Sequence, residues 1–136
     1  MTEKYITEVL KEINIDPMLL YTAYKKHGNG GPLGKLFYHA FTDAGRFQLP
    51  EGTPPFKPAI EPMGMTKVRF INQINSFHLF CDPSVSKNKK EMIFIQMCES
   101  IHPSEADVLI AIKDQTLDIK YPNITAGMLK AAGFLE

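Results

Sequence analysis

The chain has 136 residues, of which 44% are hydrophobic and 22% are charged, and this length and composition are typical of one globular domain over residues 1–136. Its 15 basic and 15 acidic residues cancel, which gives no overall attraction to nucleic acid. The chain contains no apolar run of the roughly 20 residues that a membrane-spanning helix requires, and its polar start is unlike a signal peptide, so we expect a cytoplasmic protein without membrane contact.

The first third of the chain carries apolar residues at helical spacing. A first helix is predicted over residues 5–13, with Thr2 as its N-cap. The pair Asp16-Pro17 predicts the start of a second helix, which continues through residues 19–24. The third predicted helix, residues 32–41, carries two aromatic side chains on its apolar stripe, and we expect it to be the central helix of the core.

The start of that third helix has a sequence suited to binding an anion. Gly30 and Gly31 precede it and Lys35 lies in its first turn, which would bring backbone N–H groups and a positive charge together. Glycines before a helix also commonly form a simple turn. A nucleotide-binding P-loop is excluded, because Asn29 replaces the first glycine of that motif and Leu36 replaces its Ser or Thr.

Residues 46–64 contain five prolines and two glycines. We expect an extended crossover on the surface rather than a domain linker, because the segments on either side are each too short for a core of their own. A long helix is predicted from Thr66, and Asp82-Pro83 ends it.

The last third of the chain continues the helical pattern. A further helix follows the polar stretch Ser86–Glu91, and another begins at His102–Glu105. Residues 118–123 read as a connection, after which Thr125 caps a short last helix that ends at Gly133. We therefore predict an all-α single domain of about seven helices.

Catalytic and metal-binding signatures are not found in the sequence. It contains no Gly-x-Ser-x-Gly, His-Glu-x-x-His or Cys-x-x-Cys motif. His78 and Cys81 are three residues apart and could share a metal, but no second close pair completes a site. We expect Cys81 and Cys98 to be free core thiols in a reducing compartment, and we expect no enzymatic activity, metal or cofactor.

Charge is unevenly distributed along the chain. Residues 61–90 contain five basic and two acidic residues, whereas residues 91–136 contain three basic and seven acidic residues. Such an asymmetry allows a local basic face on a neutral protein.

Several segments, in order and at similar spacing, match one known domain. They are Tyr5–Ile13, Leu20–Lys26, Leu33–Phe41, Met63–Met65, Ala106–Ile119 and Asn123–Phe134. Through these segments the chain resembles the N-terminal helical DNA-binding domain of ATP-dependent DNA ligases, most closely the short version found in tailed phages. The resemblance implies a helical domain that grips duplex DNA across the minor groove with basic side chains and helix N-termini.

The sequence also departs from the ligase pattern. No lysine begins the Lys-x-Asp-Gly motif of the ligase nucleophile, and the chain ends where the catalytic domain would start, so we do not expect strand-joining activity. Lys113-Asp114 replaces the Arg-Asp pair of the family, and Lys120-Tyr121 replaces the glycine that usually follows.

Two hypotheses of different classes remain. The first is a non-catalytic, sequence-nonspecific DNA-binding module that acts on intact or nicked duplex DNA in phage replication or repair, in the host cytoplasm. The predicted DNA-binding residues are Lys25, Lys26, Gly30, Gly31, Lys35, Lys67, Arg69, Lys87, Lys89, Lys90 and Lys113. The second is a module that binds or inhibits a phage or host protein through an exposed apolar patch formed by Phe47, Phe56, Ile60 and Met63.

Overall fold

Helices form all the regular secondary structure in the part of the chain that the structure, a computed structural model, describes: residues 5–22, 24, 32–62, 65–66 and 69–135. These residues include no β-strand, and the prediction of an all-α fold is confirmed. The α-helices are α1 (Ile6–Ile15), α2 (Pro32–Phe41), α3 (Phe70–Gln73), α4 (Lys87–Ser100), α5 (Pro103–Asp114), α6 (Leu117–Lys120) and α7 (Ala126–Ala132). The described residues also include the 3-10 helices η1 (Pro17–Leu20) and η3 (Ile74–Cys81).

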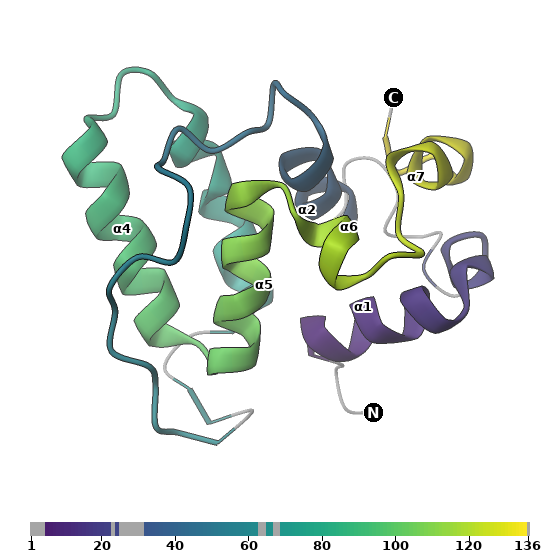
Figure 1. Cartoon of the computed structure of the whole chain (residues 1–136), viewed down its shortest axis with the longest axis horizontal. Helices are drawn as coiled ribbons and strands as arrows, with labels where there is room; N and C mark the ends of the chain where they lie inside the picture. Colours follow the sequence, from purple (N-terminus) through teal and green to yellow (C-terminus); the bar gives the residue numbers. More distant parts are fainter. Residues whose placement is uncertain (1–4, 23, 25–31, 63–64, 67–68, 136) are drawn as a thin grey trace.

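Helix α5 lies at the centre of the molecule, between α4 on one side and α1, α2 and α6 on the other (Figure 1). Its side chains Val108, Leu109 and Ile112 are fully buried. Helix α2, which the sequence predicted to be central, buries Leu36 and Phe37 against α5 and η3. The buried apolar stripe predicted for α2 is therefore confirmed, but its predicted central place is wrong, because α5 is the helix that contacts α1, α2, α4 and α6.

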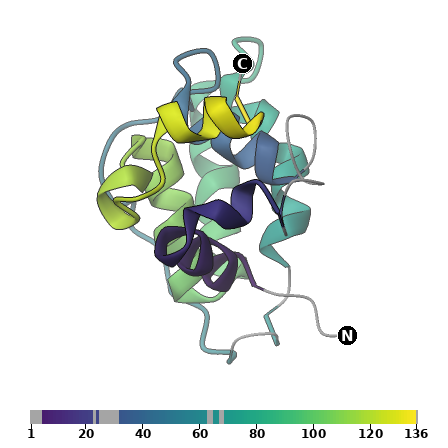
Figure 2. The ribbon, with the colours of Figure 1, turned by 90° about the vertical axis from the view of Figure 1, so that its right-hand side faces the viewer.

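The N-terminal helix α1 and the C-terminal segment around α7 lie on the same side of the molecule, which Figure 2 views directly. The Asn123 backbone N–H donates to Asn14 Oδ1 at 2.9 Å, and Asn123 Nδ2 donates to the Asn14 carbonyl at 2.6 Å. These bonds join the end of α1 to the loop before α7. The ring of Phe134, just after α7, packs edge-on against Phe37 of α2 at 5.7 Å between centroids, a favoured aromatic geometry.

Helix boundaries follow the capping residues that the sequence contains. Asp16 accepts a hydrogen bond from the Met18 N–H at the start of η1, and Thr125 accepts one from Met128 at the start of α7. Gly133 ends α7 in the left-handed conformation, with φ of 86°, which glycine adopts at little cost. These three predicted boundaries are confirmed. Thr2, the predicted first N-cap, lies outside the described residues, and Tyr5 occupies the N-cap position of α1.

Three predicted segments differ from the structure. The long helix expected from Thr66 begins as α3 only at Phe70 and continues as the 3-10 helix η3. The second helix is the single 3-10 turn η1 in the described residues rather than a helix through residue 24. The expected connection at 118–123 contains the one-turn helix α6, because Gln115 ends α5 with φ of 55° and the chain then turns back into a helix at Leu117.

A proline-rich segment, residues 46–62, crosses the molecule in extended form, and we call it the strap. It passes over α4 and α5 on one face (Figure 1) and has no regular secondary structure, as the sequence predicted; residues 63–64 lie outside the described part. Phe47, at its start, is buried in an aromatic cluster with Phe77, Phe80 and Phe94, with ring centroids 4.7 Å apart for the Phe47–Phe80 pair. The cluster fixes the first end of the strap in the core.

Candidate nucleic-acid interface

The structure separates the predicted DNA-binding residues into three groups. Exposed side chains are Lys35, Arg69, Lys87 and Lys89. Buried side chains are Lys90 and Lys113, which are 3% and 4% exposed. The rest lie outside the described residues: Lys25, Lys26, Gly30, Gly31 and Lys67.

Lys90 of α4 points into the protein rather than into solvent. Its ammonium donates a hydrogen bond to Gln48 Oε1 of the strap. Gln48 is itself fixed, since its backbone N–H donates to the Phe80 carbonyl at 2.8 Å and its Nε2 donates to the Cys81 carbonyl at 3.2 Å. The expectation that Lys90 contacts DNA is therefore wrong for this conformation.

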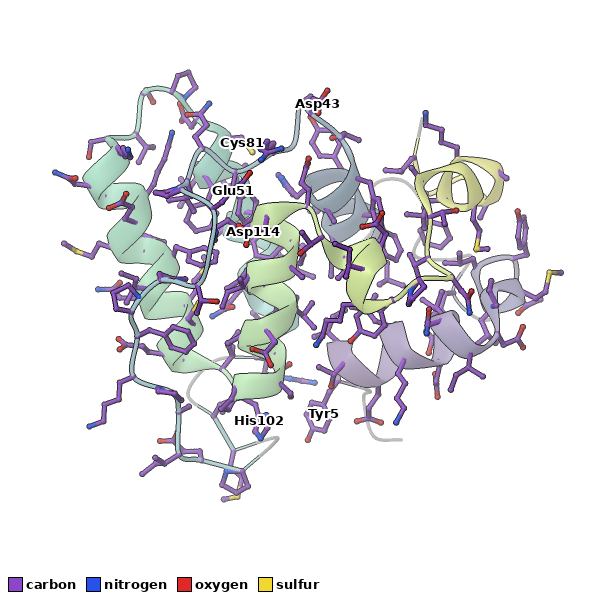
Figure 3. The ribbon with its side chains drawn as sticks, viewed as in Figure 1. Tyr5, Asp43, Glu51, Cys81, His102 and Asp114 are labelled. Atoms are coloured by element: carbon purple, nitrogen blue, oxygen red, sulfur yellow. The ribbon has the colours of Figure 1, made fainter. Side chains whose placement is uncertain are left out.

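Lys113 of α5 is also bound to the strap. Its ammonium donates to the Pro50 carbonyl at 2.7 Å and to the carboxylate of Asp114, and it lies 5.8 Å from the centroid of the Phe94 ring. The Asp114 carboxylate accepts the Gly52 N–H at 3.2 and 3.3 Å. Figure 3 shows Asp114 near the end of α5, beside the strap segment that carries Glu51. Like Lys90, Lys113 is therefore not accessible to a DNA phosphate while the strap lies in this position.

Helical spacing explains why both lysines are buried. Lys90 precedes the buried Phe94 by four residues on α4, and Lys113 follows the buried Leu109 by four residues on α5, so each lies on the inward stripe of its helix. Their long apolar stems pack in the core and carry the ammonium groups to the polar groups of the strap. This stripe position is the sequence signal that could have identified them as structural.

The exposed positive charge gathers at the start of α4. Ser86 caps this helix by accepting the Lys89 N–H, and the first turn contains no acidic residue. Lys87 lines an open cleft of about 590 Å³ together with Arg46 and Cys81. We call Arg46, Lys87 and Lys89 the cationic cluster.

Acidic groups limit the charge of this cluster. Asp43 also lines the cleft, and Arg46 Nη2 pairs with Glu51 Oε1 at 3.2 Å in an exposed ion pair. Sequence reasoning missed Arg46, because only the folded strap brings it beside Lys87.

Lys35 and Arg69 lie on other elements and do not extend the cluster directly. Lys35 is in the first turn of α2, and Arg69 immediately precedes α3. The charge of Arg69 interacts electrostatically with Glu105, whose buried carboxyl group lies in the first turn of α5. Burial raises the pKa of Glu105, while a hydrogen bond from the His102 N–H and the charges of His102 and Arg69 oppose this shift.

Cys81 and His39 lie together beneath the cleft but do not form a catalytic pair. His39 Nδ1 lies 2.9 Å from the Gly45 carbonyl and 3.6 Å from Cys81 Sγ. Burial lowers the pKa of His39, so the neutral ring donates Nδ1–H to Gly45 and that nitrogen cannot take a proton from the thiol.

The Cys81 thiol is held in its protonated form. It donates to the Gly45 carbonyl at 3.3 Å, and burial raises its pKa, a shift that Lys90 opposes. Cys98 is fully buried, and burial raises its pKa to about 12. Both are free thiols whose raised pKa values leave little nucleophilic thiolate near neutral pH.

The proposed pairing of His78 with Cys81 around a metal is not formed. His78 is exposed and its Nδ1 lies 3.0 Å from the Asn75 carbonyl. Within the described ranges, no three His, Cys, Asp or Glu side chains are placed to hold a metal ion. None of the described helices has the length and apolar character needed to cross a bilayer.

The apolar patch expected in the crossover is not formed either. Phe47 is buried in the aromatic cluster, and Phe56 is partly buried against the core. Ile60 alone of the expected patch is fully accessible among the described residues, at 91% exposed, and Met63 lies outside them.

Fold and site together define a small all-helical protein with one cationic cluster at a helix start. Residues 21–119 match the sequence model of DUF6433, a family of unknown function, and the chain belongs to this family. The matched region includes α2 to α5, the strap and the cationic cluster, whereas α1 and α7 lie outside it. No curated protein and no solved structure matches the chain.

Proposed function

We propose that this protein is a non-catalytic, sequence-nonspecific DNA-binding module that holds duplex DNA by its phosphates. The observation that supports the proposal is that Arg46 and Lys87 line one cleft at the start of α4 and that Lys89, in the same first turn, is exposed. Lysines in a first turn oppose the helix dipole, at a cost of about 0.3–1 kcal/mol each, and a bound anion would remove this repulsion. The resemblance to the ligase domain extends the proposal to phage DNA replication or repair.

Phosphate contacts explain the lack of sequence specificity in this proposal. Arg and Lys contacts to the backbone position a protein on DNA without reading its bases. If the three side chains of the cationic cluster each engage one phosphate, the logarithm of affinity falls with the logarithm of salt at a slope of about −2.7. Affinity is then reduced roughly 40-fold between about 50 and 200 mM salt.

Binding of fluorescein-labelled intact, nicked and single-stranded DNA, followed by anisotropy at these two salt concentrations, tests the proposal. We expect the variant Lys87→Glu/Lys89→Glu to reduce affinity for duplex DNA at least tenfold and to flatten the salt dependence. The control is Lys130→Glu, an exposed lysine on α7, which should retain affinity within about twofold if the cationic cluster is the contact. An absence of salt-sensitive binding at micromolar protein, or an equal loss in the control, refutes the proposal.

A second candidate function, binding to a phage or host protein, is favoured by a specific apolar surface. Ile15, Met18 and Tyr21 are 73%, 62% and 39% exposed and occur at intervals of three residues across the end of α1 and η1. Exposed apolar clusters of this kind mark protein contacts more often than isolated side chains do. This second function would be supported if the wild-type protein does not bind DNA but binds a phage or host protein, and if the variant Ile15→Ser/Met18→Ser loses that binding.

A further inference from the structure

Both buried ammonium groups are held by the same segment, the strap. Lys90 donates to the Gln48 side chain and Lys113 donates to the Pro50 carbonyl. A third contact, from the Gly52 N–H to Asp114, lies two residues further on. A short stretch of the strap therefore covers one cation of α4 and one of α5.

The strap is attached unevenly. Phe47 fixes its first end in the aromatic cluster, and residues 48–52 make the bonds to α4 and α5. Beyond Gly52 the strap is held by the partly buried Phe56 and by a hydrogen bond that the Lys57 backbone N–H donates to the Glu99 carboxylate at 2.8 Å. Most side chains of residues 48–62 are exposed, including those of Gln48 and Pro50, so beyond Phe47 little buried apolar area opposes the release of the strap.

Desolvation of the two lysines favours opening. An ammonium group taken out of water loses its hydration, and the neutral amide oxygen of Gln48 returns only part of this loss to Lys90. The Asp114 carboxylate compensates Lys113 more fully, so the cost falls mainly on Lys90. Displacement of the strap would rehydrate both groups and thereby offset part of the lost packing. The closed and open arrangements of the strap then differ little in free energy, so that a ligand can change their populations.

The uncovered lysines would continue the cationic cluster. Lys90 follows Lys87 by three residues on α4, so the two share a face of that helix. The ammonium of Lys113 lies over the ring of Phe94. Phe94 follows Lys90 by one turn of α4. An opened strap would therefore extend the positive surface from the cleft of Arg46 and Lys87 to Lys90 of α4 and Lys113 of α5.

We propose that the strap is an autoinhibitory cover, which withholds Lys90 and Lys113 from DNA phosphates while it is closed and releases them when it is displaced. The inference rests on the proposed function of the cationic cluster, and its ligand is the phosphate backbone of duplex DNA. DNA shifts the strap toward the open state only through contacts that the open state adds. Asp114 remains beside Lys113 and reduces its contribution, so opening adds between one and two effective phosphate contacts.

A loosened strap tests the inference. Gln48→Ala removes the acceptor of Lys90, and Gly52→Pro removes the N–H that binds Asp114 and is incompatible with the φ of 95° at this position. We expect the double variant to show faster hydrogen exchange in residues 48–62, to bind fluorescein-labelled duplex DNA more tightly, and to have a salt slope steeper by about 0.9 to 1.8. Adding Lys90→Met and Lys113→Met should reverse the increase in slope.

The matched control is Gln96→Ala/Gly127→Ala, on the exposed surface of α4 and α7, which should leave exchange and slope at the wild-type values. If the double variant does not fold, Gln48→Ala alone should steepen the slope by up to about 0.9 in a manner that depends on Lys90. Faster exchange in the strap with an unchanged salt slope overturns the inference.

Failure of the proposed function gives a different result. The proposed function fails if the variant Lys87→Glu/Lys89→Glu binds duplex DNA as tightly as the wild-type protein does. A loosened strap that still gains salt-sensitive binding through Lys90 and Lys113 would retain the inference even then.

Discussion

At the scale of single residues, Lys113 connects the central helix to the strap through its hydrogen bond to the Pro50 carbonyl, and its neighbour Asp114 adds the bond from the Gly52 N–H. Because it is buried with Asp114 beside it, removal of either partner leaves the other without compensation. We expect Lys113→Met and Asp114→Ala each to reduce the free energy of unfolding by about 1–3 kcal/mol.

The double variant Lys113→Met/Asp114→Ala should cost less than the two single changes together, because neither charge then remains unpaired. Urea denaturation of the four proteins measures this coupling. Additive losses would show that the pair does not act as a unit.

His39 makes stability depend on pH. Burial lowers its pKa in the folded protein, so the unfolded chain binds a proton more readily and acid favours unfolding. The contribution of His39 is present above the unfolded pKa, near 6.5, and is lost as pH falls toward the lower folded pKa. The slope for one proton does not exceed about 1.4 kcal/mol per pH unit.

Urea denaturation at a series of pH values from about 7.5 to 5.5 measures this loss. His39→Gln, which can still donate to the Gly45 carbonyl, should flatten the dependence in that range. His78→Gln, at an exposed position, removes only the smallest of the effects that act on the His39 pKa and should therefore retain most of the dependence. Glu105 has the opposite sign, because its raised pKa gives a contribution that is lost as pH rises, and it is unchanged in both variants.

At the scale of elements, the start of α5 depends on a reciprocal cap. His102 Nδ1 accepts the Ser104 N–H at 3.1 Å, and the Glu105 carboxylate accepts the His102 N–H. This is the arrangement of a capping box with histidine in the place of Ser or Thr. We expect His102→Ala to destabilise the protein by about 1 kcal/mol, whereas His102→Asn, which retains an acceptor, should cost only a few tenths. Thermal unfolding of the two variants at one pH compares them, and equal losses would assign the effect to packing instead of the cap.

For individual elements, the sequence predicts the structure correctly where neighbouring residues determine the start, the end or the type of the element. Apolar stripes and capping residues such as Asp16, Thr125 and Gly133 indicated most helices of the described chain, and five prolines indicated the strap. The predicted helix after Thr66 differs because its apolar spacing suits an α-helix and a 3-10 helix equally over short stretches. Local periodicity does not distinguish the hydrogen-bonding patterns that tertiary packing selects.

At the scale of the whole molecule, the candidate site was predictable only in part. Lys87 and Lys89 are recognisable as exposed bases in a polar helix start, but the contribution of Arg46 depends on a contact made across the fold. Lys90 and Lys113 differ from their exposed neighbours in the sequence only by their place on the inward stripe of a helix, and the strap groups that bind them are brought there only by the fold. A count of basic residues along the sequence therefore overestimates the positive surface, because the aliphatic part of a lysine side chain can pack in the core while its ammonium group binds a backbone carbonyl.

The edge-on contact between Phe37 and Phe134 bears on where this domain can be divided. The family match stops at residue 119, yet the ring that closes over the middle of α2 comes from beyond that limit. A fragment trimmed to residues 21–119 would leave an aromatic face of its own interior open to water. Relatives that share only the matched region must seal the same surface with a different side chain or with another molecule.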